Sequence, residues 1–144
     1  MKKLIIILAL LSCASSLPQT PSFRAPWRGA SEYQAALVCA TRMEYGHEIA
    51  NEFSQVEVEV GPETMQQMAT TVGRIIRIRS GFSKVKREAL WRHEAVHWLE
   101  NRRTGRWTYY PNCSAKDPTP DVEFLEREKI FNNAVSVCLK ENSR

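Results

Sequence analysis

The fold is decided by residues 91–99, which read WRHEAVHWL and contain the pattern His-Glu-x-x-His. On a helix, His93 and His97 are four residues apart, so their imidazoles leave the same face one turn apart. Two nitrogens at this spacing can bind one metal ion of the size and tetrahedral preference of Zn²⁺. Glu94 lies one step around the helix, too far away to be a good ligand. It is close enough to reach a water bound to the metal, which is the position of a general base.

The residues around the pattern predict a buried helix over residues 84–103. Ser83 can cap its beginning, and Gly105 follows its end. Apolar side chains are distributed around most of its circumference, so we expect the histidines to lie in restricted, partly dry surroundings. Burying two histidines and a glutamate would be costly without a partner such as a metal ion.

A catalytic zinc site needs a third protein ligand and one open position. A last helix is predicted to begin near Asp121, after an irregular, proline-rich connection over residues 107–120. It offers four carboxylates that could supply the third ligand: Asp121, Glu123, Glu126 and Glu128.

The order of a His-Glu-x-x-His helix, a loop and a glutamate-bearing helix resembles the zincin metallopeptidases of the gluzincin branch, the thermolysin-like type. The resemblance covers residues 74–139, and within it only the five-residue motif is specific. It implies an α+β fold: a minimal zincin-like domain in which a short β-sheet packs against the motif helix and the C-terminal helix. The metzincin branch needs a third histidine further along and is excluded, because His97 is the last histidine in the chain.

The resemblance leaves two glutamates as candidates for the third zinc ligand. Small relatives carry Glu-x-Glu-Ala, with the first glutamate on the metal, which is similar to residues 126–129 except that Lys129 replaces Ala. Thermolysin-like members instead show Glu-x-x-x-Asp, in which the Asp supports a ligand through a hydrogen bond. Glu128 and Asn132 come closest to that second pattern. We therefore expect Glu126 to be the ligand, by a narrow margin, with Glu128 as the alternate.

The activity implied by the resemblance is zinc-dependent hydrolysis of a peptide bond in a peptide or protein substrate. Zinc would lower the pKa of its water and polarise the carbonyl, while Glu94 takes the proton and passes it to the leaving amine. Tyr109 or Tyr110 could donate to the oxyanion, although packing of the loop explains these tyrosines more simply. A peptidoglycan amidase or endopeptidase would use the same chemistry, and a non-catalytic, zinc-stabilised binding module is the alternative from another class.

The N-terminus predicts export to the bacterial cell envelope, in the periplasm or at the outer membrane. Residues 1–16 read as a secretory signal, because two lysines precede an apolar run over residues 4–11 that is too short to span a bilayer. Residues 10–13 resemble a lipobox, in which Cys13 would be lipidated and would anchor the chain to the membrane. Ordinary cleavage after Ala14 or Ser16 is the alternative. Residues 17–29, rich in proline, predict a tether, and residues 30–144 form the single domain.

The charge gives no general case for nucleic-acid binding, since Lys2 and Lys3 of the signal supply two of the formal net charge of +4. Residues 44–63 contain several glutamates and no lysine or arginine, whereas residues 74–106 are rich in lysine and arginine. We expect these segments to form two complementary faces of one domain.

The remaining elements are predicted from periodicity and turn residues. A helix over residues 31–45 begins at a capping box of Ser31 and Gln34. Strands are predicted over residues 55–60 and 74–79, with a short helix over 63–71 between them. After the signal, Cys39, Cys113 and Cys138 remain, and in an oxidising compartment two of them should pair in one of three combinations.

Overall fold

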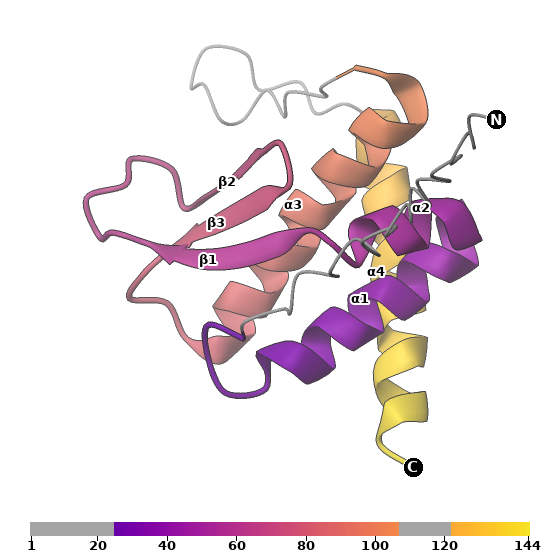
Figure 1. The fold of residues 1–144 in the computed structure, drawn as a ribbon, viewed down its shortest axis with the longest axis horizontal. Coiled ribbons are helices and arrows are strands. Elements are labelled where there is room, and N and C mark those ends of the chain that lie inside the picture. The colour runs from indigo at the N-terminus through magenta and orange to yellow at the C-terminus, as the bar shows by residue number, and fades with distance from the viewer. Residues whose placement is uncertain (1–24, 107–121) are drawn as a thin grey trace, which may run out of the picture.

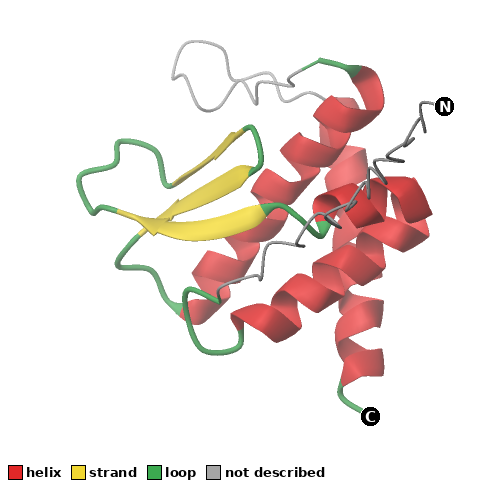
Figure 2. Ribbon diagram, in the orientation of Figure 1, coloured by secondary structure: helices red, strands yellow, loops and turns green. Residues whose placement is uncertain are grey.

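The structure is a computed structural model that describes residues 25–106 and 122–144. A small sheet and several helices make up these residues, which confirms the predicted α+β class (Figures 1 and 2). In chain order the elements are α1 (Ala30–Tyr45), α2 (His47–Phe53), β1 (Glu57–Gly61), β2 (Ala69–Val72), β3 (Ile75–Arg79), α3 (Lys84–Thr104) and α4 (Val122–Asn142).

The sheet has the strand order β1-β3-β2, with β1 parallel and β2 antiparallel to the central strand β3. The alternation expected of β3 is confirmed, because Ile76 and Ile78 are fully buried while Arg77 is exposed. The buried face of the sheet packs on α3, and α4 lies on the other side of that helix (Figure 1). The helix that carries the His-Glu-x-x-His pattern is therefore covered from two sides.

The prediction of a helix over residues 63–71 is wrong. The chain turns there and then forms the edge strand β2, which joins β3 through a tight turn at Gly73 (φ +58°). β-branched residues favour strands, and Thr70, Thr71 and Val72 gain ladder hydrogen bonds to β3 that no local pattern reveals. The short helix α2 was not predicted either.

The helix ends predicted from the sequence agree in part with those in the structure. The side chain of Ser83 accepts a hydrogen bond from the backbone N–H of Lys86 (3.3 Å), and Gly105 ends α3 in the left-handed region, as predicted. The capping box in α1 is wrong, because the helix already begins at Ala30 after Gly29 and has no side-chain cap. Gln34 is buried and reaches the carbonyl oxygen of Val56 (3.5 Å).

Residues 25–29 belong to the domain, although the sequence assigned them to the tether. Trp27 packs edge-on against Trp91 of α3, with 5.4 Å between the ring centroids, and the Arg87 guanidinium lies 5.0 Å from the Trp27 ring. Residues 1–24, with the predicted signal, lipobox and most of the tether, lie outside the described residues. Within residues 25–106 and 122–144, no helix is long and apolar enough to cross a membrane.

The disulfide joins Cys39 of α1 to Cys138 of α4, 99 residues apart in the sequence. This selects one of the three pairings that the sequence left open. Cys113, the third cysteine, lies outside the described residues. Because α4 carries side chains that contact the histidines of α3, the disulfide fixes a helix that forms one wall of the site.

A buried carboxylate ties the same helices together by charge. Glu100 of α3 is 2% exposed, accepts a hydrogen bond from the Tyr45 hydroxyl of α1 (2.9 Å) and pairs with Arg103 (2.6 Å). Arg103 also pairs with Glu123 at the start of α4 (3.0 Å). Burial, together with the charge of Glu100, raises the pKa of Tyr45 far above its ordinary value, so the phenol stays protonated and donates.

Two ion pairs join the acidic and the basic segment. Glu59 of β1 lies opposite Arg77 of β3 in the sheet register and pairs with it, and Arg102 forms a two-point contact with Glu52. These pairs are exposed, so water and salt screen them and they add little to stability.

Replacing Cys39 and Cys138 by alanine should lower the free energy of unfolding by about 2–5 kcal/mol, because the bond closes a long loop in the unfolded chain. Urea denaturation of the oxidised protein measures this loss. Cys113→Ser is the control and should leave the midpoint unchanged. A large loss in the control with none in the double variant would contradict the pairing.

Trp27→Ala should lower the free energy of unfolding by about 2 kcal/mol, because a half-buried indole loses its contacts with Trp91 and Arg87. The exposed neighbour provides the matched control, and Arg28→Ala should have an effect below about 0.5 kcal/mol. Equal effects of the two substitutions would mean that residues 25–29 are a tether after all.

Candidate metal centre

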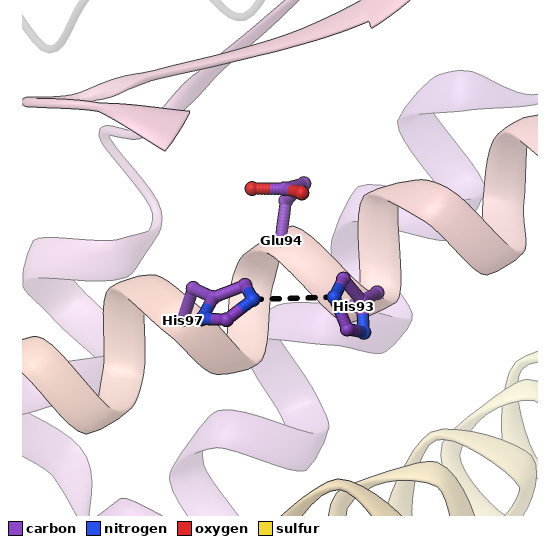
Figure 3. A group of neighbouring side chains, drawn as sticks. All are labelled: His93, Glu94 and His97. Carbon is purple, nitrogen blue, oxygen red and sulfur yellow. Dashed lines mark hydrogen bonds between the residues drawn. The ribbon is translucent and has the colours of Figure 1, made fainter. Parts of the chain in front are cut away.

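The two faces of α3 carry different parts of the site. Figure 3 shows the His93 and His97 rings facing one another along the helix, with Glu94 projecting from a different side. Glu94 contacts Thr71 of the sheet, and His93 contacts Glu128 of α4. The motif thus lies where α3 is packed between the sheet and α4.

The histidines converge through the same ring nitrogen. The Nε2 atoms of His93 and His97 are 3.2 Å apart, as the dashed line in Figure 3 marks. His97 and Glu94 are each 8% exposed, and His93 is half-buried. One ligand atom from each of these three residues lies within 4.8 Å of the others, so the group could hold a metal ion.

Glu128 determines which nitrogen of His93 carries a proton. Its Oε1 is 2.8 Å from His93 Nδ1, and the hydrogen bond to His93 keeps the pKa of Glu128 below its ordinary value. An ionised carboxylate can only accept, so Nδ1 carries the proton and donates it. When His93 is neutral, Nε2 is therefore its acceptor nitrogen, and this atom lies 3.2 Å from His97 Nε2. Burial by itself lowers the pKa of His93, but the hydrogen bond and charge of Glu128 outweigh it and raise the pKa.

Phe124 of α4 packs against both imidazoles. Its ring stacks on His97, with 4.4 Å between centroids and 26° between planes, and meets His93 edge-on at 5.5 Å. Phe124 is 2% exposed, so it covers these rings from the α4 side and limits their rotation.

Glu94 is held from the sheet. The Thr71 hydroxyl donates to its Oε2 at 2.6 Å, and the same oxygen of Thr71 is 3.3 Å from the Glu94 carbonyl oxygen. Burial raises the pKa of Glu94, while the bond from Thr71 acts in the opposite direction and favours the ionised form. A carboxylate with a raised pKa is a stronger base than an ordinary carboxylate, so it accepts a proton more effectively.

The structure brings Glu128, and not Glu126, to the histidines. Glu126 is exposed, and it projects about 200° around α4 from both Phe124 and Glu128. Glu123, another carboxylate that the sequence offered, pairs with Arg103. His47, the first residue of α2, is exposed. Asp121, Tyr109, Tyr110 and Cys13 lie outside the described residues.

Two residues of the site, Phe124 and Thr71, were missed by the sequence reasoning. Phe124 is four residues before Glu128, so the spacing alone could have placed it on the same helical face as that candidate. Thr71 gave no such signal, because it was assigned to a helix that does not form.

Comparisons of the chain with protein-family models, curated proteins and solved structures found no match.

Glu128→Ala should weaken the binding of Zn²⁺, used as the probe ion, by about 10- to 100-fold, because His93 loses the acceptor that fixes its ring. Glu126→Ala removes the same group from the exposed side of α4 and should leave the affinity within about twofold. Competition with a chromogenic chelator measures both. A larger loss in the Glu126 variant would restore Glu126 as the ligand.

Proposed function

We propose that the chain is a zinc-dependent hydrolase of peptide bonds, in which His93 and His97 hold the ion and Glu94 is the general base. The distance of 3.2 Å between the two Nε2 atoms supports this most strongly. Two nitrogens that each lie 2.0–2.1 Å from a tetrahedral zinc ion are about 3.3–3.4 Å apart. The histidines are thus already at the separation of two ligands of one ion.

The two histidines also fit zinc by their chemistry, and they supply two of the three protein ligands that a catalytic site uses. Imidazole nitrogen is a common zinc ligand, and a catalytic site keeps one position open for water or substrate. Zinc bound there would supply a Lewis acid that polarises a carbonyl group and makes water more acidic. A buried helix position strengthens such electrostatic effects, since little water screens them.

The roles of the protein groups follow from their contacts. Glu128 keeps the proton of His93 on Nδ1, so that Nε2 is the nitrogen that would bind the ion. Glu94 accepts a proton from the attacking water and passes it to the leaving amine. A raised pKa suits a carboxylate that must both take up and release a proton.

Glu128 acts as an orienting group in this proposal. The two nitrogens of an imidazole ring point in different directions, and Glu128 contacts Nδ1 while Nε2 faces His97. A carboxylate in that position supports the ligand from its outer side, as in carboxylate–histidine–zinc arrangements. Glu126, the ligand favoured by the sequence, is exposed on the other side of α4.

A zinc-stabilised binding module is the second candidate, and the burial of the site favours it. Phe124 stacks on His97, and both His97 and Glu94 are 8% exposed. Structural zinc sites are closed in this way, whereas catalytic sites keep an open position. In this alternative Glu94 would have no role in proton transfer.

The location and the substrate class remain predictions of the sequence. Export, lipidation at Cys13 and a bacterial envelope location rest on residues outside the described ranges. A peptide or protein substrate and a peptidoglycan cross-link would use the same groups, so both belong in the assay.

The purified domain should contain about one zinc per chain, and His93→Ala or His97→Ala should remove it. Glu94→Gln should keep the zinc but lower the hydrolysis of labelled casein or isolated peptidoglycan by about 10²–10⁴-fold, the usual contribution of a general base. Atomic absorption and the two hydrolysis assays measure these effects.

The outcomes separate the two candidates. A wild type that binds no zinc would remove the site altogether. A wild type that binds zinc while its biological activity survives Glu94→Gln would favour the binding module. Glu88→Gln, on the same helix but outside the histidine group, is the control for loss of a glutamate charge from α3.

A further inference from the structure

We infer that Thr71, on the edge strand β2, positions Glu94 for proton transfer; this rests on the function proposed above. Thr71 is far from the motif in sequence, and β2 brings it to the buried side of α3. Its hydroxyl donates to Glu94 Oε2 at 2.6 Å. It has no hydrogen bond to either histidine of the pair within the described residues, so it acts through Glu94.

The direction of the Thr71 side chain is set by the sheet. In the antiparallel register Thr71 lies opposite Ile76, which is fully buried against α3. Residues opposite one another in a sheet project from the same face, so Thr71 faces α3 as well. As a β-branched residue it has few rotamers in a strand, and its hydroxyl is therefore presented in a nearly fixed position.

The hydroxyl has one proton, and the distances indicate where it goes. The carboxylate oxygen is at 2.6 Å and the Glu94 carbonyl oxygen at 3.3 Å, so the carboxylate receives the stronger bond. Glu94 Oε1 has no hydrogen-bond partner within residues 25–106 and 122–144. One oxygen is thus anchored to the sheet, while the other remains able to take a proton.

An anchor matters because the glutamate side chain has three rotatable bonds. A base displaced by about 1 Å can cost about 100-fold in rate, since proton transfer depends on a short, aligned approach. The hydrogen bond from Thr71 restricts these rotations and holds the Glu94 carboxylate in one orientation. The sheet then positions the base, and α4 separately positions the histidines.

The test uses three single variants of β2. Thr71→Val keeps the shape and the strand preference but removes the hydroxyl, and it should lower kcat about 10- to 100-fold with KM within twofold. Thr71→Ser retains the hydroxyl and should recover most of the rate. Thr70→Val makes the same change on the opposite face of the strand, across from the exposed Arg77, and should leave kcat unchanged. Labelled casein and isolated peptidoglycan are the substrates, with the full exported chain loaded with zinc.

Two further measurements separate positioning from a structural role. In the Glu94→Gln background, adding Thr71→Val should cause no further loss, because the group through which Thr71 acts is already gone. The ¹³C resonance of the Glu94 side-chain carboxylate, assigned by its absence in Glu94→Gln, should move in Thr71→Val and stay in place in Thr70→Val. Zinc content should equal that of the wild type in all β2 variants.

Each result decides one statement. If Glu94→Gln is inactive while Thr71→Val keeps its kcat, the inference on Thr71 fails and the proposed function stands. If Thr71→Val slows Glu94→Gln further, or if Thr70→Val is equally slow, the effect is structural and the inference fails. If Glu94→Gln retains full hydrolysis, the proposed function fails, and the positioning role of Thr71 fails with it. The carboxylate resonance then reports only whether the contact itself exists.

Discussion

The structure depends on the burial of α3 between the sheet and α4, because this helix carries polar side chains on both covered faces. A buried polar group without a partner costs about 1–3 kcal/mol, and an unpaired charge costs more. The described residues supply partners for three of these side chains. Glu94 receives a bond from Thr71, His93 bonds to Glu128, and Glu100 is held by Tyr45 and Arg103.

The partners come from different elements, so the same contacts that pay the cost of burial also fix the arrangement of those elements. The sheet is tied to α3 at Glu94, and α4 is tied to it at His93. α1 is tied to α4 by the Cys39–Cys138 disulfide. Each contact is modest in energy, but together they leave α3 little freedom to shift or rotate. A site on such a helix keeps its geometry before any ligand binds.

The separation of the supports has a consequence for chemistry. A hydrolase of the proposed kind needs two independent alignments: the lone pairs of the ligands towards one point, and a carboxylate towards the water that reacts. In this fold Glu128 and Phe124 of α4 restrain the histidines, and Thr71 of β2 restrains the base. The two alignments therefore do not compete for the same supporting groups.

The sequence by itself determined the local parts of this protein. The spacing of His93 and His97, the Ser83 cap, the Gly105 end and the alternation in β3 depend on neighbours a few residues away, and all of these are present in the structure. The tertiary structure decided what depends on distant segments. Pairing with β3 turned residues 69–72 into a strand against the predicted helix, and it brought Thr71 to Glu94. The rotation of α4 turned Glu128 and Phe124 towards the histidines and left Glu126 exposed. Glutamates two residues apart look alike in a sequence, and only the packing of the helix selects which one is inside.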